Sequence, residues 1–99
     1  MHIFRMATAE NTNLKFEFPV KGQKYLVKNF TDGNIYAGLG DGTDKNKMIL
    51  IPPKTSEIIF NSERYSDLHT AHIVTVIPDM TSEEGVEVRC LGWLAERTL

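Results

Sequence analysis

The residues of this chain that most resemble a chemical site lie in one glycine-rich segment, NFTDGNIYAGLGDGTDKNK, at positions 29–47. Within it, GLGDG invites comparison with the loop that holds the pyrophosphate of a dinucleotide. That loop works because it leads from a strand into a helix whose first N–H groups face the phosphates. Here the following residues, TDKNKMILIP, have the pattern of a strand, and no G-K-[ST] sequence provides a phosphate loop of the other kind. We therefore expect no nucleotide site in this segment.

The acidic residues of the same segment could instead offer oxygen ligands to a calcium ion. Asp41 and Asp44 lie close together with a hydroxyl between them, and Ca²⁺ prefers about six to eight oxygen ligands. The spacing lacks the alternating acidic pattern closed by a glutamate, and Lys45 and Lys47 place positive charge beside the site. Asp, Asn and Gly also favour tight turns. We interpret residues 40–47 as an exposed polar loop and keep a metal site as the alternative.

A second candidate for metal binding is the sequence DLHTAH, which places Asp67, His69 and His72 close together. On a helix the two histidines would share a face, whereas on a strand their odd spacing sends them to opposite faces. Two imidazoles and one carboxylate without a further ligand pair are a weak indication of zinc. Surface histidines are the favoured interpretation, with zinc binding as the alternative.

Residues for covalent or acid–base catalysis are few and poorly placed. Cys90 shares one face of a predicted strand with Val86 and Val88, where a thiol behaves as a small apolar group with a raised pKa. Glu83 and Glu84 are adjacent, but they lie in a turn-like, solvated stretch that gives no reason for a raised pKa. The G-x-S-x-G sequence of a nucleophilic serine is absent. We therefore expect a protein that is not an enzyme and needs no cofactor.

Aromatic side chains could form a stacking platform, although most of them fall on the apolar side of a strand pattern and belong to a core. Tyr65 and Trp93 are the two whose positions a core explains least. Together with acidic residues of the glycine-rich segment and its tyrosine, they form the predicted contact surface: Tyr36, Asp41, Asp44, Tyr65 and Trp93. Carbohydrate is the ligand that such a surface would suit.

The elements that must position these residues are predominantly strands. In LKFEFPV, apolar and charged residues alternate with a period of two, which is typical of a strand with one solvated face, and Pro19 places that strand at an edge or a bulge. Asp32–Gly33 predicts a hairpin turn. Apolar side chains throughout Met48–Ile51 predict a strand covered on both faces. The predicted strands span residues 14–20, 24–30, 34–39, 47–52, 56–60, 72–78 and 86–94.

This pattern predicts an all-β fold, a single antiparallel β-sandwich of about seven or eight short strands with a jelly-roll connection as one option. The one segment with helical tendency, 61–69, is long enough for a single helical turn at most. We expect residues 1–99 to form one domain, in which 1–12 form a flexible arm or an edge strand.

Composition limits the classes of partner. The chain has 99 residues and a net charge of −2, which provides no electrostatic footprint for nucleic acid, although folding could still gather a local basic patch. No apolar run approaches the roughly 20 residues that span a bilayer, and the first residues lack the pattern of a signal peptide. The chain has a single cysteine, so we expect a protein that is made and folded in the cytoplasm, without an intramolecular disulfide, and that becomes part of a virion if it is a phage component. We therefore interpret the glycosylation sequence Asn29-Phe30-Thr31 as a strand end.

Three stretches carry a resemblance to known proteins: FEFPVKGQKYLVKNFTDGNIYAGLG, ILIPPKTSEIIF and GVEVRCLGW. In these stretches, which cover most of residues 14–93, the chain resembles small uncharacterised β-sandwich proteins encoded among the virion structural genes of phages and prophages of Gram-positive bacteria. The resemblance implies a head fibre, decoration or tail-associated component of the virion, with protein partners and a homo-oligomeric state. It assigns no functional residues.

Overall fold

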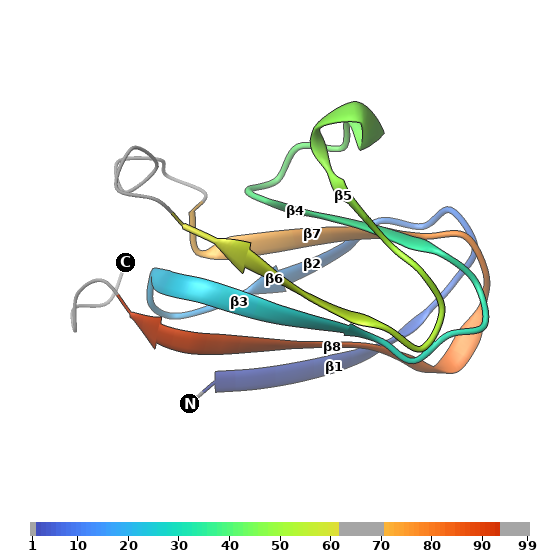
Figure 1. Cartoon of the computed structure of the whole chain (residues 1–99), viewed down its shortest axis with the longest axis horizontal. Coiled ribbons are helices and arrows are strands. Elements are labelled where there is room, and N and C mark those ends of the chain that lie inside the picture. The colour runs from blue at the N-terminus through green and yellow to red at the C-terminus, as the bar shows by residue number, and fades with distance from the viewer. Residues whose placement is uncertain (1, 62–70, 94–99) are drawn as a thin grey trace.

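The computed structural model describes residues 2–61 and 71–93 of the chain. It contains eight strands and one short 3-10 helix (Figure 1). In chain order these are β1 (His2–Thr8), β2 (Leu14–Glu17), β3 (Gly22–Asn29), β4 (Ile35–Leu39), η1 (Lys45–Lys47), β5 (Ile49–Ile51), β6 (Ser56–Phe60), β7 (Ile73–Pro78) and β8 (Ser82–Trp93).

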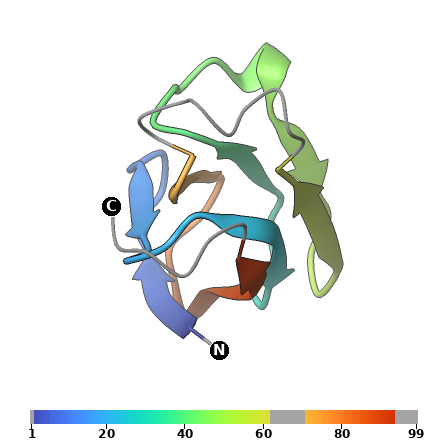
Figure 2. The same ribbon diagram turned by 90° about the vertical axis from the view of Figure 1, so that its left-hand side faces the viewer.

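The strands form two antiparallel four-stranded sheets that pack face to face, which confirms the predicted all-β sandwich (Figure 2). Sheet A has the order β1-β8-β3-β6, and sheet B has the order β2-β7-β4-β5. The pairs β1–β8, β2–β7, β3–β6 and β4–β5 are those obtained when one long antiparallel ribbon is rolled into two layers. This is the strand order of a jelly roll.

The two sheets enclose one core, because alternate side chains of each strand face inward. In β8 the predicted apolar face is buried, since Val86, Val88 and Cys90 are fully covered. Tyr25 is buried among them, where its hydroxyl accepts from Gly22 N (2.8 Å) and donates to Ala71 O (3.0 Å). The other core residues are Phe16, Phe18, Val27, Ile35, Ala37, Ile51, Ile59, Val74 and Val76.

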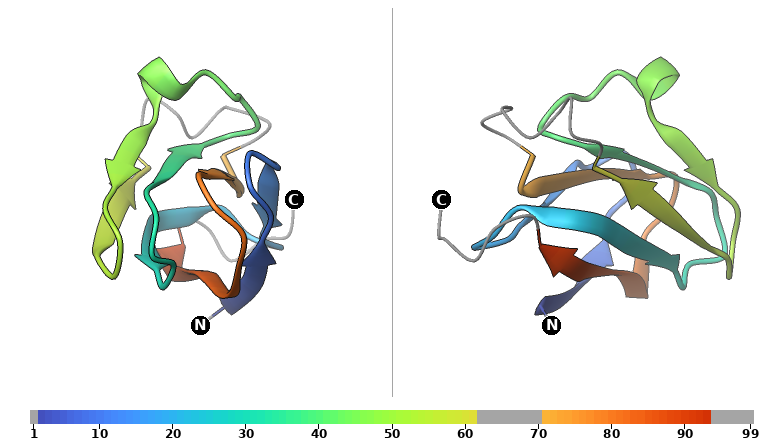
Figure 3. Two further views of the ribbon diagram at one scale, coloured as in Figure 1. Left: turned by 90° about the vertical axis from the view of Figure 1, so that its right-hand side faces the viewer. Right: turned by 60° about the vertical axis from the view of Figure 1, so that its left-hand side comes forward.

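The predicted hairpin at Asp32–Gly33 is wrong. β3 lies in sheet A and β4 lies in sheet B, so the turn between them crosses from one layer to the other (Figure 3). Gly33 is needed there for space, because an added Cβ would lie 2.9 Å from Met80 Cγ. The turn after β5, through Lys54, also crosses between the sheets, since β6 belongs to sheet A. Turn chemistry specifies a reversal of the chain but not the layer in which the next strand pairs.

The predicted covering of Met48–Ile51 on both faces is also wrong. Among the described residues, β5 is a short edge strand that pairs with β4 alone, and the exposed fractions of Ile49 and Leu50 are 39% and 48%. Only Ile51 reaches the core. An apolar sequence therefore lies at a sheet edge instead of a sheet centre. The helical turn predicted for 61–69 lies outside the described residues except for Asn61, which is buried.

Candidate functional site

The structure separates the residues of the predicted contact surface. By its register, Tyr36 in β4 is on the outer face of sheet B, where Lys45 Nζ lies 4.8 Å from the centre of its ring. Asp41 is exposed in the loop after β4, and Asp44 accepts a hydrogen bond from Asn46 N (3.0 Å) at the start of η1. Trp93 ends β8 in sheet A, opposite Gly22, and Tyr65 lies outside the described residues. Positions 36 and 93 thus belong to different sheets.

The metal-binding alternatives receive no support from geometry. Within residues 2–61 and 71–93, no group of three or more His, Cys, Asp or Glu side chains is arranged to hold a metal ion. Asp44 caps η1, and His72 Nε2 lies 3.3 Å from Glu17 Oε2 in the neighbouring strand. His69 lies outside the described residues, so the pairing of the two histidines stays a prediction.

The catalytic candidates occupy structural positions. Cys90 is fully buried in the core, and burial raises the pKa of its thiol, which lowers its reactivity. Glu84 Oε2 lies 3.4 Å from Lys54 Nζ at the surface. Cys90 therefore packs in the core, and Glu84 pairs with Lys54 at the surface.

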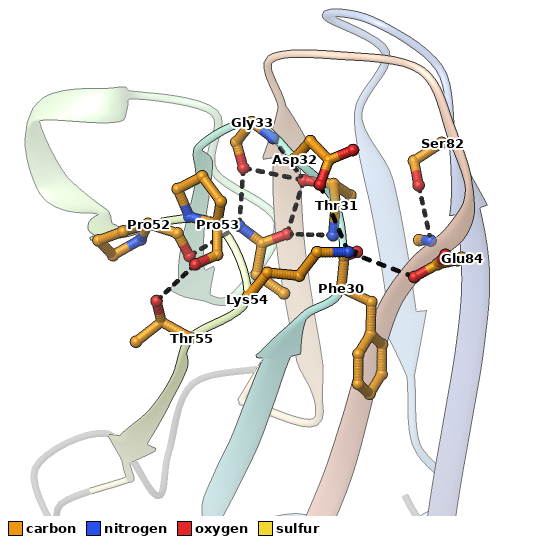
Figure 4. Close-up of polar contacts among 12 residues, drawn as sticks. Phe30, Thr31, Asp32, Gly33, Pro52, Pro53, Lys54, Thr55, Ser82 and Glu84 are labelled. Carbon is orange, nitrogen blue, oxygen red and sulfur yellow. Dashed lines mark hydrogen bonds and ion pairs between the residues drawn. The ribbon is translucent and has the colours of Figure 1, made fainter.

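A dense cluster of hydrogen bonds surrounds Asn29, and Figure 4 shows its neighbours Thr31, Gly33 and Pro52 where the chain crosses between the sheets. Its amide Nδ2 lies within hydrogen-bond distance of three backbone carbonyls, those of Gly33 (2.9 Å), Ile51 (3.0 Å) and Pro52 (3.0 Å). Its Oδ1 accepts from Thr31 N (2.9 Å) and lies 2.7 Å from Thr31 Oγ1. Because β3 belongs to sheet A and the carbonyls belong to chain entering or leaving sheet B, this side chain ties the two layers together.

Lys54 extends the same cluster at the surface. Its Nζ donates to Phe30 O (2.6 Å) and forms ion pairs with Asp32 (3.5 Å) and Glu84 (3.4 Å), which joins the turn after β5 to the turn after β3 and to the start of β8 (Figure 4). The polar side-chain atoms of Asn29 and Lys54 form hydrogen bonds and ion pairs with other residues of the same chain. The NFTDG sequence, which contains the glycosylation pattern, is therefore a structural clamp, and the buried Asn29 is inaccessible to a glycosyl carrier.

The outer face of sheet A carries a group of exposed residues that was not predicted from the sequence. Register places its side chains in rows that run across the four strands. One row is Ile3, Arg89, Leu26 and Ile58, and the next toward the strand ends contains Leu91, Lys24 and Phe60. We define the sheet A face by these residues together with Arg5, Glu87, Lys28 and Ser56.

The sheet A face is rich in exposed apolar side chains. The exposed fraction is 68% for Phe60, 48% for Ile3 and 36% for Ile58, and Leu26 and Leu91 are half-buried. Large apolar groups gathered on one exposed face indicate an interaction surface, whereas single exposed ones need no explanation. The alternation of each strand marked these positions as solvated, but only the order of the strands brings them together.

The same face is basic, although the whole chain is slightly acidic. It carries Arg5, Lys24, Lys28 and Arg89 against Glu87, while the net charge of the chain is −2. Glu87 is buried beneath Arg5, whose Nη2 lies 3.1 Å from its Oε1, and Arg89, whose Nε lies 2.6 Å from its Oε2. Folding thus gathers the local basic patch that composition left open.

Electrostatics fix the protonation of this buried carboxyl. Burial by itself raises the pKa of Glu87, but the hydrogen bonds from Arg89 and Arg5 outweigh burial and hold its pKa below the ordinary value. The Arg5 guanidinium also lies 4.8 Å from the centre of the Phe30 ring, which orients it along the face. The result is a pair of arginines held in place over Glu87, one in the row of Ile3 and Ile58 and one in the neighbouring row.

In comparisons with known proteins, no family model, no curated protein and no solved structure matches the chain. Within the described ranges, none of the helical structure is long and apolar enough to cross a membrane.

Proposed function

We propose that the chain is a non-enzymatic structural or assembly protein that binds other protein subunits through the sheet A face. The observation that carries this proposal is the gathering of Ile3, Ile58 and Phe60 with four cationic side chains on one exposed sheet surface. An apolar surface with interspersed charge is suited to an acidic and partly apolar protein partner, because burial supplies affinity and charge supplies orientation.

The more specific form of the proposal is a virion component of a phage or prophage, which follows from the resemblance in the sequence. The jelly-roll strand order is compatible with it, since viral capsid domains use this architecture. Lectin domains use it as well, so the fold by itself does not choose between assembly and carbohydrate binding. Carbohydrate binding has less support, because Lys45 lies over Tyr36 and the predicted contact residues are divided between two sheets.

Expression of the chain together with the structural proteins encoded by its neighbouring genes tests the proposal. We expect at least one of them to co-purify in a fixed ratio, and the chain to be present in purified particles. Phe60→Glu should weaken that binding at least tenfold, because it places an acidic group in an apolar row of a basic face. Leu50→Glu is the matched control, since Leu50 is a comparably exposed apolar residue outside the sheet A face.

A chain that is monomeric at high concentration and binds no structural protein would exclude an assembly role. Binding that responds to Leu50→Glu and not to Phe60→Glu would place the interface elsewhere. Selective binding on a glycan array would favour the carbohydrate alternative.

A further inference from the structure

The hydrogen-bonding pattern of β6 leaves one side of that strand available for pairing. Asn29 N donates to Thr55 O and Asn61 N donates to Gln23 O, both at 2.9 Å. In an antiparallel ladder the residues that bond to a given neighbour alternate, so Glu57 and Ile59 also direct their backbone groups toward β3. Ser56, Ile58 and Phe60 therefore direct their N–H and C=O groups away from β3, toward the outside of the sheet.

Nothing in the part of the chain that the structure describes pairs with this outer side, since sheet A ends at β6. Four of the five β6 residues are exposed, and only Ile59 is buried. An edge of this kind is a template for another strand unless it is blocked by charge, proline, a bulge or short length.

The other three edges each carry one of those blocks. Phe18 N donates to His72 O, so in β2 only the charged Lys15 and Glu17 direct backbone groups outward. β5 has three residues and is followed by Pro52. The pairing of β1 with β8 is interrupted between Met6 and Thr8. β6 is the edge with the longest uninterrupted set of outward groups.

We propose that β6 pairs antiparallel with β6 of a second copy of this chain, about a two-fold axis at Ile58, an inference that rests on the proposed assembly function. With the axis at Ile58, Ile58 faces Ile58 of the partner subunit and Ser56 faces Phe60 of the partner subunit. All three outward residues of each strand are then hydrogen-bonded, and the two sheets A become one continuous eight-stranded sheet.

The neighbouring axis positions are less favourable. An axis at Glu57 places two carboxylates directly opposite each other and leaves Phe60 unpaired. An axis at Ile59 leaves Ser56 unpaired. The strand is thus most self-complementary about its central residue, as an isologous interface requires.

The sheet A face is compatible with this arrangement. The apolar row that ends at Ile58 continues into the same row of the partner subunit, which brings Leu26 of both subunits close to the axis. Lys24 of one subunit lies in the same row as Lys28 of the partner subunit, with two strands between them. The distance between them is about 14 Å, which exceeds the Debye length of about 8 Å in physiological salt. No like charges on this face therefore meet across the axis.

Glu57 is the one group that opposes the pairing. It lies diagonally across the axis from Glu57 of the partner subunit, at roughly 7–8 Å in a regular antiparallel pair. An edge contact between five-residue strands also buries little area compared with the roughly 800 Å² per partner of a standard stable interface. We therefore expect a reversible dimer that dissociates on dilution and tightens with added salt.

Sedimentation velocity on the full chain over a range of concentrations tests the dimer. Ile58→Lys should raise the dissociation constant at least tenfold, because it places two ammonium groups opposite each other at the axis. Leu50→Lys is the matched control, since Leu50 is an exposed apolar residue at the edge of the other sheet, outside the sheet A face, and it should leave the dissociation constant unchanged. Glu57→Gln should lower the constant by about threefold.

Ile58→Pro tests backbone pairing specifically. It removes an N–H that points away from β3, so the intramolecular ladder keeps its bonds while the dimer loses the two central ones. Circular dichroism and thermal unfolding establish that each variant is folded. We expect the folded Ile58→Pro variant to be monomeric.

A dimer whose constant is unchanged by both Ile58 variants would overturn the proposal and show that another surface is used. A wild-type chain that stays monomeric yet binds a structural protein would overturn the dimer and leave the assembly function intact. A wild-type chain that neither self-associates nor binds a structural protein would count against the assembly function itself.

Discussion

Asn29 shows how one side chain can hold two sheets together. Asn29→Asp keeps the shape of the side chain but replaces its donor with an oxygen that faces the carbonyls of Gly33, Ile51 and Pro52. We expect the free energy of unfolding to fall by about 4 kcal/mol, since several buried acceptors lose their partner at once. Urea unfolding followed by circular dichroism measures this loss. Asn13→Asp, at an exposed position, is the control, and a loss below about 1 kcal/mol at Asn29 would contradict the clamp.

Glu87 predicts how stability depends on pH. Its pKa in the folded chain lies below the ordinary value of 4.5, so its contribution to stability is fully present above about pH 5 and is lost as the pH falls through the lower folded pKa. Glu87→Gln removes the ionisable group, and we expect it to destabilise the chain at neutral pH but to flatten the decline below pH 4.5. Urea unfolding at a series of pH values compares the two proteins. An equally steep decline in both would mean that other carboxyls control the acid transition.

At the scale of the element, β8 depends on Gly85, which lies against the backbone of β1. Gly85 has a φ of +65°, and an added Cβ would overlap the backbone carbonyl of Met6 in β1. We expect Gly85→Ala to lower the free energy of unfolding by about 3 kcal/mol or more, because both strain and a backbone clash oppose it. Gly42→Ala is the matched control, since nothing lies within 4 Å of its added Cβ. Equal thermal stability of the two variants would contradict this role.

Most strands can be predicted from the sequence because alternation is local. Phe16 in β2 and Phe18 just after it, like Val86, Val88 and Cys90 in β8, are apolar at every second position, and all five are buried. The prediction that β5 is covered on both faces is wrong because Met48–Ile51 is apolar at every position, so no alternation identifies a solvated face. The prediction of a hairpin at Asp32–Gly33 is wrong because the residues of a turn do not specify which strand the next strand will pair with.

At the scale of the whole molecule, the jelly-roll order decides what is exposed. β5 and β6 are consecutive and form edges of different sheets on the same side of the sandwich, while β1 and β2 form the edges on the other side (Figure 2). A rolled ribbon always leaves such edges, and among the described residues β6 is the edge with the longest uninterrupted set of outward backbone groups. The proposed dimer would close that edge and extend the sheet A face over two subunits.

The sequence by itself determined the all-β class, the position of most strands and the apolar faces that form the core, because these follow from the period-two pattern and from turn residues close along the chain. The sheet A face was decided only by tertiary structure. Ile3, Arg89, Leu26 and Ile58 are far apart in the sequence, and no local pattern relates them. They become one row because strand order and register place β1, β8, β3 and β6 side by side, and this order depends on how the ribbon buries its apolar faces as a whole.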